Sequence, residues 1–202
     1  MKKIETTTRF IILALIFPIM GLLAGWWLFF NRLPDARILI PAFGGLLLGV
    51  VVDAIFLKRW IQKANRASLW IWGLVYLFYA ICTFGFFMGV PVFNVVLGIP
   101  AGILFASRLR AAQTPSDEVP ASARRCAWFT TLVMLIICMA SAGIALLDPY
   151  TAANLEGLFR LPFHLTSGMI WGLIIIGGTI TLAVQWLLTH TVVRRTYQWL
   201  DA

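Results

Sequence analysis

The chain has 202 residues, of which 61% are hydrophobic and 12% are charged. This composition lies far outside the range of soluble globular proteins and predicts that the folded chain is surrounded by a lipid bilayer. In a soluble protein, a formal net charge of +8 would suggest nucleic-acid binding. Here the basic residues stand at the ends of apolar runs, where orientation in a membrane explains them, so no nucleic acid is expected as a partner.

The first two apolar runs are residues 10–30 and 38–57. The first run is too long for the apolar core of a secretory signal, so we expect it to be retained as a transmembrane helix. Gly21 and Gly25 stand four residues apart in it, and such spacing allows the backbone of another helix to approach closely. The sequence leaves open whether that helix belongs to the same chain or to a second copy.

Residues 67–107 contain no Asp, Glu, Lys or Arg. As a single helix, this stretch would be about 60 Å long, roughly twice the thickness of the hydrocarbon core of a bilayer. We therefore expect it to turn back on itself at residues 89–91, giving spans at 69–88 and 91–107. Pro100 leaves a carbonyl of the preceding turn without its donor, so the second of these spans is expected to be kinked and central.

A polar cytoplasmic loop is expected at residues 108–127, followed by the fifth span at 128–147. In the outer segment that comes next, 148–166, Glu156 stands four residues before an arginine, an arrangement that favours a short helix. We expect this helix to be amphipathic and to lie on the outer surface. The sixth span is expected at 168–189.

Basic residues are distributed unequally between the two sides of these spans. All of the 16 lysines and arginines except Arg32, Arg37 and Arg160 lie at the amino terminus, in the second and fourth connections or in the carboxyl tail. Because cytoplasmic loops carry the excess of Lys and Arg, both termini are expected in the cytoplasm. The sequence thus predicts an all-α, polytopic membrane protein. It would be a bundle of six transmembrane helices forming one domain over residues 1–202, in a bacterial-type plasma or inner cell membrane.

Polar residues inside the apolar runs are the candidates for a functional site, because polar groups are expensive in hydrocarbon. In the last span, polar or small residues follow one another at steps of four, which places them on one helix face. This stripe consists of Gly177, Thr181, Gln185 and Thr189. It is expected to face other helices, either for interhelical hydrogen bonding or as the lining of a polar pathway. The ligand or pathway candidates in the whole chain are Asp53, Tyr76, Tyr79, Thr83, Asn94, Gly98, Pro100, Gly102, Thr181 and Gln185.

Asp53 is the only carboxylate within an apolar run, and it lies about one turn from the basic boundary at Lys58. Three interpretations are open. The carboxylate could reach water or Arg59, it could form a salt bridge to a neighbouring helix, or it could be a proton or ligand site. Tyr76 and Tyr79 share a face of the third span, where their hydroxyls could satisfy buried carbonyls or hold a substrate.

No motif of a nucleotide-binding loop, a serine hydrolase or a zinc protease is present, and no C-x-x-C pair occurs. The three cysteines and the two histidines also lack the spacing of metal ligands; they are Cys82, Cys126, Cys138, His164 and His190. No catalytic residue, metal or cofactor is therefore expected.

These features favour a small transporter or the membrane subunit of a transport complex. With no nucleotide site of its own, such a protein would draw energy from a gradient or from a partner ATPase subunit. Two other hypotheses remain: an accessory or scaffold protein of the membrane, and a membrane-embedded enzyme acting on a lipid. The expected partners are the lipid bilayer and other membrane or ATPase subunits.

Overall fold

The computed structural model describes residues 2–29, 35–64, 67–87 and 89–201, and every regular element in these ranges is a helix. Six segments of the described chain are long and apolar enough to span a membrane. The prediction of an all-α protein with six candidate spans is therefore confirmed. Arg32, which entered the count of basic residues, lies outside the described residues. The chain divides into two compact units, Met1–Ser68 and Leu69–Ala202.

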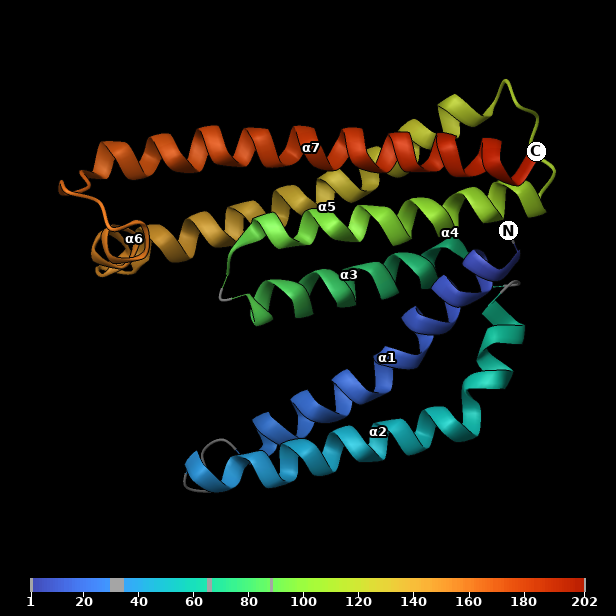
Figure 1. Ribbon diagram of the computed structural model, residues 1–202, viewed down its shortest axis with the longest axis horizontal. Coiled ribbons are helices and arrows are strands. Elements are labelled where there is room, and N and C mark those ends of the chain that lie inside the picture. The colour runs from blue at the N-terminus through green and yellow to red at the C-terminus, as the bar shows by residue number, and fades with distance from the viewer. Residues whose placement is uncertain (1, 30–34, 65–66, 88, 202) are drawn as a thin grey trace. The chain divides into compact units, whose positions relative to one another are not determined.

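The first unit is a hairpin of two long helices, α1 (Lys2–Phe29) and α2 (Asp35–Ala64), drawn in blue and cyan in Figure 1. Long apolar runs form these helices because a backbone in hydrocarbon must satisfy its own hydrogen bonds. Each helix contains a proline, Pro18 in α1 and Pro41 in α2. The two helices pack against each other along their length.

Glycines bring the two backbones of this hairpin into direct contact. A Cβ built on Gly21 would overlap the carbonyl oxygen of Gly45 and lie 2.7 Å from its carbonyl carbon. A Cβ on Gly49 would come within 2.6 Å of the Cα of Pro18. Gly21 thus packs against a helix of its own chain, as the first of the two alternatives for its spacing predicted.

The second unit begins with α3 (Leu69–Phe86), followed by the 3-10 helix η1 (Pro91–Leu97) and α4 (Gly98–Ala111). Gly89 has a φ of 81°, the left-handed conformation that glycine adopts without steric cost. This turn separates α3 from η1, where the sequence predicted that the chain reverses.

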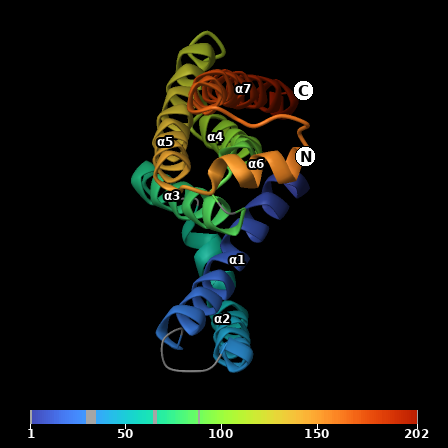
Figure 2. The same cartoon turned by 90° about the vertical axis from the view of Figure 1, so that its left-hand side faces the viewer.

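The remaining helices of the second unit are α5 (Val119–Leu147), α6 (Thr151–Phe159) and α7 (Ser167–Asp201). α7 packs against both α4 and α5. The short helix α6 confirms the helix expected after the fifth span, and it lies across the direction of its neighbours. Figure 1 shows it end on beside a side view of α7, and Figure 2 shows the reverse.

Pro100 differs from its expected role. The fourth span is not a kinked α-helix with Pro100 in its middle, because the 3-10 segment η1 ends at Leu97 and α4 begins at Gly98. Pro100 therefore lies in the first turn of α4, where a missing N–H removes no intrahelical bond. The irregularity is present, but it falls on the residues before Pro100.

The fifth helix starts earlier than the apolar run that predicted it. α4 continues to Ala111 and α5 begins at Val119, with Pro120 in its first turn, so much of the stretch 108–127 is helical. An α-helix satisfies its own backbone groups in water as well as in lipid, so the end of an apolar run does not end the helix. Hydropathy marks the apolar part of a helix and not its termini.

A small apolar cluster joins α4, α5 and α7 near the basic ends of these helices. It contains Ala106, Val119, Ala123, Cys126, Val193 and Tyr197. The hydroxyl of Tyr197 donates a hydrogen bond of 2.6 Å to the carbonyl oxygen of Thr114 in the α4–α5 connection. This bond ties the connection to the last turns of α7.

Candidate functional site

The buried face of α7 is a single row of side chains at steps of four. Its first half is polar and its second half is apolar; the row contains Thr181, Gln185, Thr189, Val193 and Tyr197. Gln185 and Thr189 are fully buried, and Thr181 is 7% exposed. The polar stripe therefore faces other helices, as its spacing predicted.

Hydrogen bonds join this stripe to α3 and α5. The amide nitrogen of Gln185 lies 3.3 Å from the hydroxyl of Tyr76 and 3.2 Å from the hydroxyl of Thr189, and it donates to both. The hydroxyls of Thr189 and Thr130 lie 3.1 Å apart. Thr130 in turn donates to the carbonyl oxygen of Ala127, at 3.0 Å. We call Tyr76, Thr130, Gln185 and Thr189 the polar cluster.

One polar atom of this cluster lacks a partner. The amide oxygen Oε1 of Gln185 is buried and has no hydrogen-bond partner in the structure. If the amide were rotated by 180°, its oxygen would face the two hydroxyls and its nitrogen would take the unpaired position. In either orientation one strong hydrogen-bonding atom of Gln185 stays unsatisfied, and such an atom costs about 1–3 kcal/mol when buried.

The backbone of Gly98 closes one side of the polar cluster. A Cβ built there would lie 2.7 Å from Oγ1 of Thr189 and 2.9 Å from Nε2 of Gln185. Gly98 is also the residue at which η1 passes into α4. The change from 3-10 to α geometry thus occurs directly beside the buried amide, and a Cβ at this position would force Thr189 or Gln185 to shift.

Asn94 is a second buried polar residue of this unit. Its side chain is 2% exposed, and its amide nitrogen donates a hydrogen bond of 2.8 Å to the carbonyl oxygen of Ala80. The bond ties η1 to α3. The amide oxygen of Asn94 has no hydrogen-bond partner, so this amide resembles Gln185 in being only half satisfied.

The remaining candidates of the second unit are not joined to the polar cluster by hydrogen bonds. Thr181 donates to the carbonyl oxygen of Gly177 within α7, at 2.7 Å. Gly102 lies against α7, where a Cβ would approach the side chain of Val192 at 2.7 Å. Tyr79 packs its ring edge to face against Phe78. Thr83 and Pro100 are half-buried.

Asp53 belongs to the first unit, in α2. Its side chain is 5% exposed, and both carboxyl oxygens are buried without a hydrogen-bond partner. Among the described residues, Arg59 forms no salt bridge with it. Of the three interpretations left open by the sequence, contact with water or with a neighbouring cation finds no support in this geometry.

Sequence reasoning missed Thr130 and the indole N–H of Trp186. Thr130 stands in an apolar run of α5, and nothing in its local sequence distinguishes it from Thr131. The indole nitrogen of Trp186 is buried without a partner, and the ring stacks on that of His190 with centroids 4.9 Å apart. A search for polar residues in every span would have found Thr130, but not which helix it meets.

Glu156 on α6 holds the connection between α6 and α7 in place. The carboxylate of Glu156 accepts a hydrogen bond of 2.6 Å from the N–H of Leu165, and Nδ1 of His164 lies 3.1 Å from its other oxygen. The bond from the backbone of Leu165, together with that from His164, lowers the pKa of Glu156 below its ordinary value. These contacts fix the path of the chain between the two helices.

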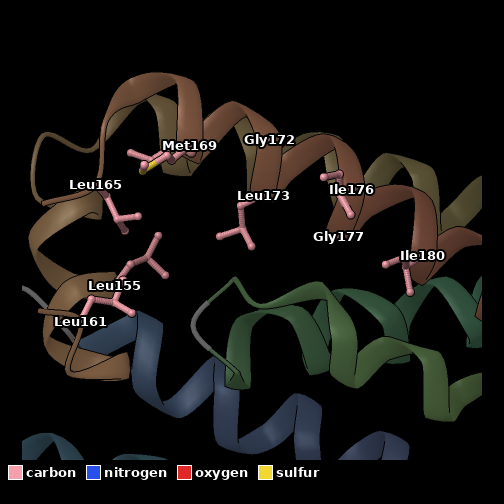
Figure 3. Close-up of a pocket in the computed structure, with 10 residues that line it drawn as sticks. Leu155, Leu161, Leu165, Met169, Gly172, Leu173, Ile176, Gly177 and Ile180 are labelled. Carbon is pink, nitrogen blue, oxygen red and sulfur yellow. The ribbon is translucent and has the colours of Figure 1, made fainter. Parts of the chain in front are cut away.

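An apolar cavity of about 540 Å³ lies between α6 and the first half of α7. Figure 3 shows its side chains converging from the two helices and their connection. Its lining contains no side chain that donates or accepts a hydrogen bond; the residues are Leu155, Leu161, Leu165, Met169, Ile170, Gly172, Leu173, Ile176, Gly177 and Ile180. Such a surface offers room but no polar recognition.

The described residues contain no group of three or more His, Cys, Asp and Glu side chains that could hold a metal ion. The fold and the buried polar cluster define a helical protein with six membrane-spanning candidates and a half-satisfied polar centre in its second unit. In comparisons with known proteins, no family model, no curated protein sequence and no solved structure matches this chain.

Proposed function

We propose that the protein is a small membrane transporter or the membrane subunit of a transport complex. In this proposal, the polar cluster around Gln185 contacts the transported solute. The observation that carries it is the unpaired amide atom of Gln185, which is fully buried. Polar side chains in a membrane domain form contacts between helices or line substrate pathways, and an atom left unsatisfied by the helix contacts favours the second role, because each unsatisfied group is expensive there.

Two further features support this role. The cluster draws its side chains from three helices, α3, α5 and α7, and the fourth helix contributes the backbone of Gly98 at a 3-10 junction. Irregular backbone at membrane depth is tolerated where it is buried in protein or lines a cavity, and transporters place such breaks at their binding sites. A rearrangement of η1 would open the cluster on its α4 side.

The proposal includes an orientation and a location. Both termini lie in the cytoplasm, since the amino terminus, the second and fourth connections and the carboxyl tail carry nearly all basic residues. The chain crosses a bacterial-type plasma or inner membrane. Energy for transport comes from a gradient or from a partner ATPase subunit.

An accessory or scaffold role is the second candidate, and a specific observation favours it. The close approach of Gly98 to Thr189 and Gln185 leaves no space on that side of the cluster. A lipid-acting enzyme is supported less, because His164 pairs with Glu156 while His190 stacks on Trp186. His164 precedes the first turn of α7, and His190 lies 23 residues after Ser167, about 35 Å along the helix.

Solute profiling of membrane vesicles distinguishes the first two candidates. Vesicles from cells that express the wild type, Gln185→Leu or Leu187→Ala are compared for the solutes they accumulate. Leu187 lies on the exposed side of α7 and serves as the matched control. If the protein is a transporter, at least one solute should accumulate in vesicles with the wild type and in those with Leu187→Ala. The same solute should not accumulate in vesicles with Gln185→Leu. Identical profiles for all three, at equal expression, would favour the scaffold.

A further inference from the structure

The α1–α2 hairpin holds a buried acid that the proposed transport site does not use. Both oxygens of Asp53 are inaccessible to solvent, and no N–H or O–H group of the described residues donates to either of them. The charged side chains described on these two helices include Arg9 on α1 and Lys58 and Arg59 on α2, and none forms a salt bridge with Asp53. An ionised carboxylate in this position would be both buried and unpaired, which is very costly.

The glycine contacts fix the register in which α1 and α2 face each other. Gly25 lies against Pro41 and Ala42, and Gly21 lies against Gly45. One turn further, Gly49 lies against the backbone of Phe17 and Pro18. The two helices are antiparallel. A residue about four positions earlier in α1 therefore faces a residue about four positions later in α2.

The next step in this register brings Asp53 opposite the turn that contains Ala14. Ala14 has a small side chain, which permits the two helices to remain close here. Aromatic rings gather near this end of the hairpin: the ring of Phe17 stacks on that of Trp60, with centroids 4.5 Å apart, and Phe56 also stacks on Trp60. None of these residues donates a hydrogen bond to Asp53, and this includes the indole N–H of Trp60.

Pro18 changes the chemistry of that same turn. In an α-helix, the N–H of residue 18 donates to the carbonyl oxygen of residue 14, but proline has no N–H. The carbonyl oxygen of Ala14 consequently lacks its helical donor. Two groups that can only accept hydrogen bonds, an ionised Asp53 and this carbonyl, would then face each other in an apolar setting, and neither would be satisfied.

We propose that Asp53 is a proton-binding site, in which the carboxyl group carries a proton at neutral pH and donates it as a hydrogen bond to the carbonyl oxygen of Ala14. One proton taken from water satisfies both groups, because the protonated acid becomes a donor. Release of the proton to water leaves the carboxylate and the carbonyl as two facing acceptors. The proton therefore stabilises the hairpin, and its loss loosens the contact of α1 with α2.

Infrared difference spectroscopy of the full chain in lipid nanodiscs tests this site. Subtraction of the Asp53→Asn spectrum from the wild-type spectrum at neutral pH should show the C=O stretching band of a protonated carboxyl. Pro18→Ala restores an N–H to the turn and so competes for the carbonyl of Ala14; the band should then move to higher frequency, as expected for a weaker hydrogen bond. A difference spectrum with only carboxylate bands would overturn the proposal.

If Asp53→Asn does not fold, the wild type alone is sufficient. Asp53 is the one buried acid among the described side chains, so a protonated-carboxyl band at neutral pH in the wild type supports the site and its absence contradicts it.

A thermal double-mutant cycle provides an independent measurement. Asp53→Ala should lower the midpoint of thermal unfolding in the wild-type background and lower it less in a Pro18→Ala background, where the carbonyl of Ala14 has a helical donor. Equal shifts in the two backgrounds would show that Asp53 and the freed carbonyl do not interact, and would contradict the proposal.

Discussion

The amide of Gln185 on α7 and the hydroxyl of Tyr76 on α3 lie 3.3 Å apart, although 109 residues separate them in the chain. The hydroxyl oxygen of Tyr76 is the acceptor. Because the amide nitrogen carries two hydrogens, it also donates to Thr189. This pair joins the first and last helices of the second unit through a side chain that still has an unpaired polar atom. The substitutions below separate its contribution to stability from its contribution to function.

Gln185→Leu should abolish transport with little loss of stability. The change removes two hydrogen bonds, worth roughly 0.6 kcal/mol each in membrane proteins, and relieves an unpaired buried atom that costs about 1–3 kcal/mol. The free energy of unfolding should therefore stay within about 1 kcal/mol of the wild-type value or rise. Denaturation in nanodiscs and solute profiling of vesicles check the two effects. A large loss of stability would instead assign the amide a structural role.

Gly98→Ala should destabilise the second unit. The added Cβ would lie 2.7 Å from Oγ1 of Thr189, closer than van der Waals contact allows, and overpacking of this kind costs typically 1–3 kcal/mol. Gly85→Ala in α3 is the matched control, because a Cβ there meets no atom within 4 Å. Thermal unfolding of both variants measures the difference; equal midpoints would show that the cluster has room for a methyl group.

Gly45→Ala should separate the helices of the first unit, whereas Gly44→Ala should leave them in place. The two glycines are neighbours in sequence, but a Cβ on Gly45 would overlap the carbonyl of Gly21 while one on Gly44 meets nothing within 4 Å. Because the obstacle is backbone and cannot rotate away, we expect a cost of about 3 kcal/mol or more for Gly45→Ala. Cross-linking of cysteines placed on α1 and α2 reports the separation. Similar cross-linking in both variants would contradict the packing.

Acid should loosen the connection between α6 and α7. The pKa of Glu156 is lowered in the folded chain by the bonds from Leu165 and His164. Its contribution to stability is therefore fully present above the ordinary pKa of a glutamate and is lost as the pH falls through the lowered value. The protection factor of the Leu165 N–H against hydrogen exchange, which corrects for the intrinsic pH dependence of exchange, should fall only in that acid range. Glu156→Gln should remove most of this pH dependence, and an unchanged profile would exclude the carboxylate as its source.

Labelling from outside the cell tests the proposed orientation. Asn154 in α6 and Ser116 in the α4–α5 connection are both exposed, so a cysteine at either position is accessible from its own side. With both termini in the cytoplasm, a membrane-impermeant maleimide should modify Asn154→Cys in intact cells and should modify Ser116→Cys only after permeabilisation. The opposite pattern would reverse the orientation.

Hydropathy and spacing predicted the parts of the fold that depend on one segment at a time. The six apolar runs and the buried face of α7 follow from composition and from the period of the helix, because a residue such as Gln185 occupies the same face in any packing. The partner of that face could not be predicted. Thr130 lies beside Thr189 only because α5 and α7 pack in one particular register, and that register depends on every contact between the two helices.

The burial of Asp53 was unpredictable for the same reason. In sequence, the residue stands one turn from Lys58 and is compatible with a solvated boundary position. The close packing of Gly21 on Gly45 and of Gly49 on Pro18 draws α1 over this part of α2, and that packing requires both helices at once. Likewise, the 3-10 segment ends just before Gly98, which packs against Thr189 and Gln185 of α7. The positions of the prolines in the sequence did not predict this contact.

The apolar cluster of Ala106, Val119 and Val193 is bordered by arginines on all three helices, including Arg108, Arg124 and Arg194. α7 has 35 residues and is about 52 Å long, which exceeds the roughly 30 Å of hydrocarbon. We therefore expect this end of the unit to stand in water, where exclusion of apolar surface from solvent drives packing. Helices inside lipid lack that driving force. Urea should consequently dissociate the arginine-rich end first, before it affects the contacts within the membrane.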